Sequence, residues 1–217
     1  MPDFTIENET KGIIVGIDEA GRGPWAGPVV AGAVIIKNHN LPEFLLQGLD
    51  DSKKISATKR EKLYQALFQA QEDGLLLIGI GEASAQEIDE LNILQATFLA
   101  MKRAVLSLPI SPENAIIDGN QIPKNFPCQC QCIIKGDARS YSISAASIIA
   151  KVYRDNLMSD LAQKYPYYGF EKNAGYGTAQ HQKGLSEFGI CPEHRLSYRP
   201  IQAFKSITCP SAISKNN

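Results

Sequence analysis

The sequence contains no long hydrophobic run and no excess of charge of either sign. No stretch of this 217-residue chain approaches the ~20 consecutive apolar residues that a membrane-spanning helix needs. The first residues, MPDFTIENETK, are polar and acidic, unlike a secretory signal. These absences predict a cytoplasmic protein with no membrane partner. The net charge of −1 gives no global basic field to attract nucleic acid, although local basic clusters such as Lys59, Arg60 and Lys62 are present.

Cysteine is also scarce. The chain has five cysteines, an odd number that fits a reducing compartment better than a disulfide framework. Cys128, Cys130 and Cys132 alternate along the sequence, which places them on one face of a strand. Zinc sites usually have at least two residues between neighbouring cysteine ligands. We therefore expect small buried or edge-strand residues here in preference to a metal site.

Short apolar runs and amphipathic helical patterns follow one another along the rest of the chain. Strands are expected at residues 12–17, 29–36, 74–82, 115–119 and 130–137. Helices are expected at residues 56–72, 84–105, 140–163 and 178–188, with a short helical segment near Glu193. Ser84 and Glu87 form the sequence pattern of a capping box. This order predicts an α/β fold with a mixed five-stranded sheet flanked by helices.

Carboxylates follow three of the predicted strands. Asp18 and Glu19 end the first strand, Asp118 ends the fourth, and Asp137 follows the fifth. If these strands are parallel and adjacent, their C-terminal ends lie ~4.8 Å apart at the edge where α/β sheets form binding sites. Four clustered carboxylates need counter-charge, and all-oxygen ligands favour Mg²⁺ or Mn²⁺. Each acid alone could instead cap a helix or occupy a turn, and the recurrence of the pattern favours a metal site.

The segment Gly21-Arg22-Gly23 separates the first two predicted strands. It could be a simple turn, because glycine accepts positive φ and Pro24 begins an extended segment. Alternatively, the missing Cβ atoms could let the backbone approach a ligand closely while Arg22 donates to a phosphate or a sugar hydroxyl. The segment matches neither the dinucleotide fingerprint nor a P-loop.

Six blocks of this sequence resemble, in order and spacing, the type 2 ribonuclease H family, ribonuclease HII. They are "GIDEAGRGPWAGPVVAGAVI", "LDDSKKIS", "IIDGN", "KGDARSYSISAASIIAKVYRD", "YYGFEKNAGYGT" and "HRLSY", which together span residues 12 to about 200. The arginine between the two glycines, Arg22, is typical of ribonuclease HII, whereas the similar ribonuclease HIII has another residue at this position. The resemblance implies a ribonuclease H-like fold at residues 1–165 and a small C-terminal helical segment at residues 166–217 that completes the substrate site. We expect the tail, residues 206–217, to be disordered.

The resemblance also implies an activity. Members of this family are hydrolases that cleave the RNA strand of RNA/DNA hybrids. They also nick duplex DNA on the 5′ side of a single embedded ribonucleotide, as in ribonucleotide excision repair, and leave a 5′-phosphate and a 3′-hydroxyl. We expect a metal-dependent endonuclease that uses two ions, Mn²⁺ or Mg²⁺, and acts as a monomer.

By the same resemblance, individual residues acquire roles. Asp18, Glu19, Asp118 and Asp137 correspond to the four metal-binding catalytic acids. The substrate-binding positions are Gly21, Arg22 and Gly23, which correspond to the motif that contacts the ribose 2′-hydroxyl, and Tyr176, which corresponds to a tyrosine stacked beneath the neighbouring sugar. Lys53 could contact a phosphate or simply be solvated.

The chain departs from the common pattern of the family at Asn173, Ala174 and Tyr198, where histidine, lysine and phenylalanine are frequent. These positions concern the grip on the substrate and not the acids. His181 and His194 follow no metal-ligand spacing, so we interpret them as structural or substrate-facing. The serines of the helix at 140–163 could face the substrate backbone or allow close packing on the sheet.

Two other functions fit parts of the sequence. A nuclease or strand-transfer enzyme acting on DNA could use the same strand-end acids, but it would have no use for a ribose contact at Gly21–Gly23. A non-catalytic nucleic-acid binder could keep the fold, but four intact acids argue against it. Protein partners and the preferred ion are not indicated by the sequence.

Overall fold

A computed structural model describes residues 2–49 and 55–205 of the chain. The predictions for Lys53 and for the tail at 206–217 lie outside the described residues. The chain divides into two compact units. The first contains Met1–Ala20, Val30–Glu82 and Thr97–Val152, and the second contains Gly21–Val29, Ala83–Ala96 and Tyr153–Asn217. The functional division at residue 165 stays a prediction.

The first unit is built on one mixed sheet. Its strands are β1 (Ile14–Ala20), β2 (Val29–Ile36), β3 (Leu76–Ala83), β4 (Asn114–Asp118) and β5 (Gln129–Ile133). They lie in the order β3-β2-β1-β4-β5. β1 is antiparallel to β2, whereas β1 and β4 are parallel, as are β4 and β5. The predicted mixed five-stranded sheet is therefore confirmed.

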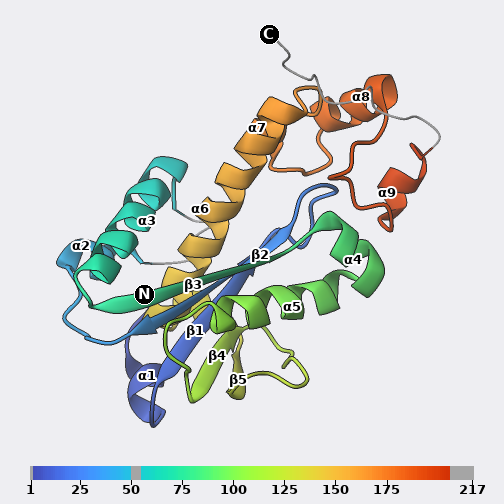
Figure 1. Cartoon of the computed structure of the whole chain (residues 1–217). Helices are drawn as coiled ribbons and strands as arrows, with labels where there is room; N and C mark the ends of the chain where they lie inside the picture. Colours follow the sequence, from blue (N-terminus) through green and yellow to red (C-terminus); the bar gives the residue numbers. More distant parts are fainter. Residues whose placement is uncertain (1, 50–54, 206–217) are drawn as a thin grey trace. The chain divides into compact units, whose positions relative to one another are not determined.

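Helices cover both faces of this sheet (Figure 1). On one face lie α2 (Glu43–Gly48), α3 (Ala57–Glu72) and the first half of α6 (Tyr141–Lys164). Their apolar side chains, including Leu45, Leu63 and Ile149, form a buried cluster with Val34 of β2. On the other face α5 (Ile93–Leu106) packs so closely that a Cβ on Gly81 of β3 would overlap its backbone. Burial on both faces explains the continuous apolar run of β2.

Small residues let α6 approach the sheet. A Cβ on Gly16 would lie 2.5 Å from the backbone nitrogen of Ile143, and one on Gly32 would overlap the carbonyl of Ala146. The serines of this part of the helix, including Ser144 and Ser147, are buried. Close packing on the sheet is therefore the explanation that the structure supports for the serines.

The predicted helix at 84–105 is two helices. α4 (Ala85–Leu91) begins at the predicted capping box, in which Ser84 accepts from the Glu87 amide and the Glu87 side chain accepts from the Ser84 amide. Asn92 then adopts φ 72°, a conformation that asparagine tolerates better than most residues. Its Oδ1 accepts from the amides of Leu94 and Gln95, and so caps α5. The helical pattern continues through Asn92, so the sequence did not reveal the break.

The second unit contains α4, the later part of α6, and three further helices: α7 (Phe170–Asn173), α8 (Ala179–Phe188) and α9 (Arg199–Gln202). Its core includes Met158, Tyr168, Phe170 and Leu185. α8 agrees with the helix predicted at 178–188, with Thr178 as its N-cap. The helical segment expected near Glu193 is wrong, because residues 192–194 form a turn.

The backbone of His194 explains that error. It bridges to Ala26, and the next helix starts only at Arg199. Among the described elements, five short ones were also not predicted: α2, α7, α9, α1 (Thr5–Glu9) and the 3₁₀ turn η1 (Gly136–Ala138).

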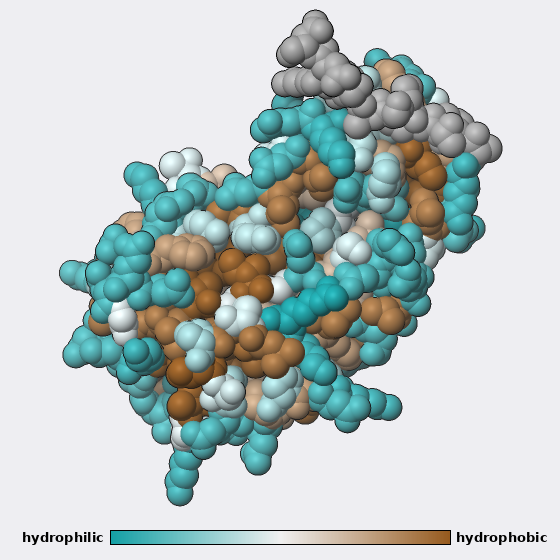
Figure 2. Space-filling view, viewed as in Figure 1, coloured by the Kyte–Doolittle hydropathy of each residue, from teal (hydrophilic) through white to brown (hydrophobic). Residues whose placement is uncertain are grey.

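The surface is mostly polar, with brown apolar areas between the teal residues in the view of Figure 2. One cavity of about 410 Å³ in the first unit is lined largely by isoleucines, among them Ile13, Ile36 and Ile110. Among the described helices, none is both long enough and apolar enough to cross a membrane.

Candidate active site

Asp18 and Asp118 lie at the C-terminal ends of neighbouring parallel strands. The register pairs Ile17 of β1 with Ile117 of β4, and each aspartate follows its isoleucine directly. Side chains two positions apart on a strand share a face, so Asp18 points to the same side as Gly16, the side on which α6 packs. The prediction that the first and fourth strands are parallel and adjacent is confirmed. The fifth strand completes the same parallel set.

Burial and like charge act together on Asp18. Its side chain is only 7% exposed. Loss of hydration is the largest cause that raises its pKa well above the ordinary value, followed by the charges of Glu19 and Asp118. Hydrogen bonds from the Ser147 side chain and the Glu19 amide oppose the shift only in part. The ionised form of Asp18 would therefore be stabilised by a nearby positive charge.

Asp118 is tied to the turn that carries Asp137. Its Oδ1 accepts a hydrogen bond of 2.7 Å from the amide of Gly136, the first residue of η1. Asp137 is the next residue and is half-buried. Lys135 adopts the left-handed conformation (φ 55°) just before this turn, which directs the chain from β5 toward α6. The connection therefore brings Asp137 within one residue of a direct partner of Asp118.

The donor chemistry of these acids fits a hard divalent cation. Asp18, Glu19 and Asp118 supply only carboxylate oxygens, the ligands that Mg²⁺ and Mn²⁺ prefer. The negative charges of Glu19 and Asp118 disfavour ionisation of Asp18, and a bound cation would offset that repulsion. Within residues 2–49 and 55–205, however, no three His, Cys, Asp or Glu side chains are already arranged around a single ion position. The carboxylates would therefore have to adjust their rotamers to share a cation.

The Gly21–Gly23 segment belongs to the second unit and has a tightly determined backbone. Gly21 adopts φ 96°, and a Cβ at this position would also overlap the guanidinium of Arg154. Only glycine fits both constraints. Arg22 and Gly23 are exposed, and a Cβ on Gly23 would lie 3.5 Å from Cε1 of Tyr176. The structure therefore brings the glycine segment and Tyr176 together, although they are 150 residues apart in sequence.

Tyr176 stands on a loop that the second unit holds firmly. Its side chain is 52% exposed. The loop is fixed by Asn173, whose Oδ1 accepts from the Gly175 amide and whose Nδ2 donates to the Tyr168 carbonyl. The Trp25 amide donates to the Gly175 carbonyl over 2.8 Å. Asn173, one of the departures from the family pattern, is thus buried and holds this loop in place.

The two histidines of this unit form a buried pair. His181 Nε2 and His194 Nε2 are 2.9 Å apart. His181 Nδ1 lies 3.0 Å from the Tyr176 carbonyl, while His194 Nδ1 accepts from the Cys191 amide. Burial lowers the pKa of both rings, that of His194 to about 3 with a further contribution from His181. The pair is structural and neutral, in agreement with one of the two predicted roles.

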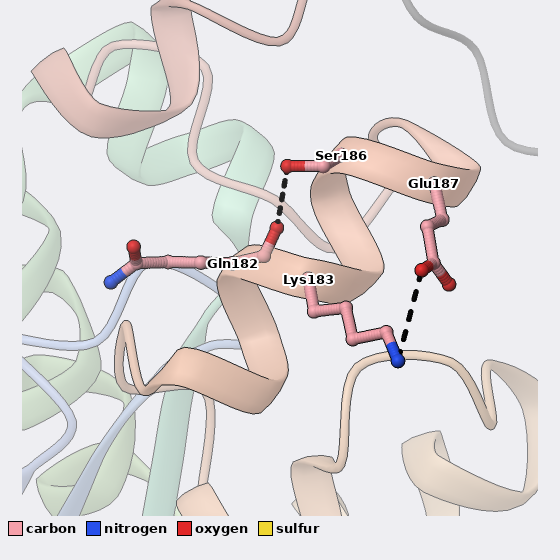
Figure 3. A network of polar contacts seen from close by, with 4 residues as sticks. All are labelled: Gln182, Lys183, Ser186 and Glu187. Carbon is pink, nitrogen blue, oxygen red and sulfur yellow. Dashed lines mark hydrogen bonds and ion pairs between the residues drawn. The ribbon is translucent and has the colours of Figure 1, made fainter.

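The four residues of α8 drawn in Figure 3 make contacts with one another within the helix. Lys183 and Glu187 form an ion pair at 3.8 Å with both side chains well exposed, and the Ser186 hydroxyl donates to the Gln182 carbonyl. An exposed pair of this kind stabilises a helix by about 0.3–0.5 kcal/mol. The face of α8 that these residues occupy is therefore a solvated helix surface.

The cysteines of β5 are free and half-buried. Cys130 and Cys132 lie on the same face of the strand, as predicted. Burial is the first cause that raises the pKa of Cys130 to about 12, and the pKa of Cys132 is raised for the same reason.

The sequence analysis assigned no role in holding the glycine segment to the side chains that contact it. Arg195 and Tyr198 contact its backbone through hydrogen bonds, and Arg154 holds the residues that follow it. All three are distant from the segment along the chain, and a buried arginine has no local sequence signature. The "HRLSY" block, which includes Arg195 and Tyr198, was the only signal available.

Comparison with known proteins identifies the family. The sequence profile of the family described as "Ribonuclease HII" matches residues 15–201. The ribonuclease HII of Paramagnetospirillum magneticum is 50% identical over 204 residues, which cover 94% of this chain and 98% of that relative.

Solved structures agree on the fold. The structure of ribonuclease H2 from Pyrococcus horikoshii aligns with a TM-score of 0.73 at 30% identity and covers 89% of this chain and 97% of that chain. A ribonuclease HIII, Bst-RNase HIII in complex with Mn²⁺, aligns with a TM-score of 0.68 over 88% of this chain and 68% of its own. Its 17% identity supports a similarity of fold alone.

Proposed function

The chain belongs to the ribonuclease HII family, and from that premise we propose that its strand-end carboxylates hold divalent cations for phosphodiester hydrolysis. Membership makes the chain a ribonuclease H hydrolase, an endoribonuclease that acts on the RNA of RNA/DNA hybrids. The observation that supports the metal proposal is that Asp18 and Asp118 lie on neighbouring parallel strands. Burial and the charges of Glu19 and Asp118 disfavour ionisation of Asp18, which a bound cation would offset.

Four acids have the catalytic role in this proposal. Asp18, Glu19, Asp118 and Asp137 would hold the cations through their carboxylate oxygens, which suit either Mn²⁺ or Mg²⁺. A pair of such ions, when bound, supplies activation of the attacking water and stabilisation of the leaving 3′-oxygen. The products would be a 5′-phosphate and a 3′-hydroxyl.

Substrate recognition is assigned to the second unit. The exposed backbone of Arg22 and Gly23 would contact the ribose 2′-hydroxyl, which distinguishes RNA from DNA. The half-exposed ring of Tyr176 offers a stacking surface worth about 1–3 kcal/mol for a base or a sugar next to the scissile bond. Lys53, outside the described residues, is proposed as a phosphate contact.

The biological setting follows from these assignments. A contact with a single 2′-hydroxyl would let the enzyme nick duplex DNA on the 5′ side of one embedded ribonucleotide, the first step of ribonucleotide excision repair. We propose that it does so in the cytoplasm as a monomer. Duplex DNA containing ribonucleotides and RNA/DNA hybrids are the proposed nucleic-acid partners.

The test compares three duplexes: an RNA/DNA hybrid, a DNA duplex with one ribonucleotide, and the matched DNA duplex. The wild-type protein should cleave the first two in Mg²⁺ or Mn²⁺ and leave the third intact. Asp118→Asn should fold normally, because the amide oxygen can still accept from Gly136, and lose about 1,000-fold in rate. Cleavage of the DNA duplex would indicate a DNA nuclease, and binding without cleavage in either metal would indicate a non-catalytic binder.

A further inference from the structure

The side chain of Arg195 is fully buried, at 0% exposure, and is directed at the backbone of the glycine segment. Its Nη1 donates to the Arg22 carbonyl over 2.9 Å, and its Nη2 donates to the carbonyl of Gly21. The same guanidinium donates from Nε to the Gly27 carbonyl over 3.0 Å. One side chain therefore holds both ends of the loop that connects β1 to β2.

Tyr198 completes this arrangement. Its hydroxyl donates to the Arg22 carbonyl over 2.7 Å and accepts from Nη1 of Arg195 over 3.0 Å. The Arg195 guanidinium carbon lies 5.2 Å from the centroid of the tyrosine ring. The Arg22 carbonyl is thus held by two donors that also bond to each other. Tyr198 is one of the positions at which the chain departs from the family pattern, and its hydroxyl makes both of these bonds.

These contacts determine how the peptide groups of the segment are oriented. In a trans peptide the carbonyl oxygen and the following N–H point in opposite directions, and the described residues contain no cis peptide bond. Because the Gly21 and Arg22 carbonyls point at Arg195, the N–H groups of Arg22 and Gly23 point away from it. Both residues are exposed, and these N–H groups are directed to the side of the segment opposite to Arg195.

The planar fork of arginine is essential to this geometry. A guanidinium donates in several fixed directions at once, whereas a lysine ammonium is a compact charge on a flexible stem. Hydrogen bonds from a charged donor are also the stronger kind. Arg154 extends the support, because it donates to the carbonyls of Pro28 and Ala174 and so connects the same loop to the one that carries Tyr176.

We propose that Arg195 and Tyr198 are positioning residues for ribose recognition: by holding the Gly21 and Arg22 carbonyls they fix the peptide planes of Gly21–Gly23, and so the orientation in which this backbone meets the 2′-hydroxyl. This inference rests on the proposed function of that segment. Neither side chain needs to touch the substrate. The Tyr198 hydroxyl increases the preference for a duplex with a ribonucleotide, and the guanidinium of Arg195 is required for that preference.

The test measures recognition separately from catalysis. Binding of a DNA duplex with one ribonucleotide and of the matched DNA duplex is measured with metal chelated, for the wild-type protein, Tyr198→Phe and Arg195→Lys. Tyr167→Phe is the matched control, because it also removes a tyrosine hydroxyl from the second unit while its ring stays stacked on Phe188. Thermal unfolding and Mn²⁺ affinity are measured for every variant.

Tyr198→Phe should lower the preference for the ribonucleotide duplex by about 3- to 10-fold, the effect of losing one well-placed hydrogen bond. Its melting temperature and Mn²⁺ affinity should stay close to those of the wild-type protein, which a merely structural role would not predict. Arg195→Lys should lower the preference further, and Tyr167→Phe should leave it unchanged.

Two results would overturn the inference, and only the second would also contradict the proposed function of the glycine segment. If Tyr198→Phe keeps the full preference, the positioning role is wrong while the proposed function stands. If the wild-type protein itself binds both duplexes equally, the proposed ribose contact at Gly21–Gly23 fails and this inference fails with it. Should Arg195→Lys not fold, the decision rests on Tyr198→Phe.

Discussion

The carboxylate of Asp18 is kept from water by the fold and faces two further acids. Burial and like charge both favour its neutral form, which is useless for binding a cation. Stability and function therefore make opposite demands on this residue. Such a conflict is typical of a functional site and uncommon for a carboxylate with a purely structural role.

The conflict predicts an unusual pH dependence. The folded-state pKa of Asp18 lies above its unfolded value, so its contribution to stability is fully present below the unfolded pKa and is lost as pH rises through the folded pKa. Asp18→Asn should therefore raise the free energy of unfolding of the metal-free protein at pH 8 and flatten its decline with pH. Urea unfolding over a pH series with a chelator measures this.

Added Mn²⁺ should reverse the wild-type trend, because it favours the ionised carboxylate and so stabilises the protein more as pH rises. Glu72→Gln, at the exposed end of α3, is the control and should follow the wild-type curve. If Asp18→Asn is less stable than the wild-type protein at pH 8 without metal, the carboxylate has a structural role instead.

At the scale of the residue, the proposed catalytic and substrate-binding residues were easier to predict from the sequence than the residues that hold them in place. Strand-end acids and glycines are visible as patterns because their spacing follows the strands. Arg195 and Ser147 are not, since their roles depend on which distant backbone or side chain they meet after folding. The supporting residues become apparent only from their contacts.

Among the elements, the contact between α6 and the sheet sets the position of Asp18. It depends on glycines that leave room for the helix backbone, at Gly16 and Gly32. A helix lying this close to the strand is also what buries the carboxylate two residues after Gly16. The packing and the perturbed pKa thus have one origin.

Gly16→Ala should cost about 1–3 kcal/mol of unfolding free energy, because its methyl group would overlap the backbone of Ser142 and Ile143. Gly23→Ala is the matched substitution: its φ is not in the left-handed region, and its Cβ would meet only Tyr176 at an ordinary 3.5 Å. It should leave stability within about 0.5 kcal/mol of wild type. Urea unfolding of both variants decides, and equal losses would contradict the packing account.

Elements with a strong period were predicted well, and those fixed by single backbone conformations were not. The strands and the helices α3 and α8 agree with their predicted ranges, and in the structure α3 and α8 are capped by Ser56 and Thr178. The break at Asn92 depends on one positive φ, which leaves no periodic signal. The turn at residues 192–194 depends on a backbone bridge to Ala26, far away in the sequence.

For the whole molecule, the net charge of −1 does not show where the charged groups lie. The acids that we propose as cation ligands belong to the first unit, whereas the residues of the proposed ribose contact belong to the second unit. Composition alone therefore argued weakly against a nucleic-acid substrate. Order and spacing along the chain, which composition ignores, pointed to it instead.

The account depends most on the claim that the strand-end acids bind cations together. Calorimetric titration of the whole protein with Mn²⁺, repeated for Asp118→Asn and for the Glu72→Gln control, tests it directly. We expect Mn²⁺ to bind the wild-type protein and the control equally, and Asp118→Asn to bind at least about 10-fold more weakly. An Asp118→Asn protein that is folded and binds Mn²⁺ as tightly as the wild type would contradict the account.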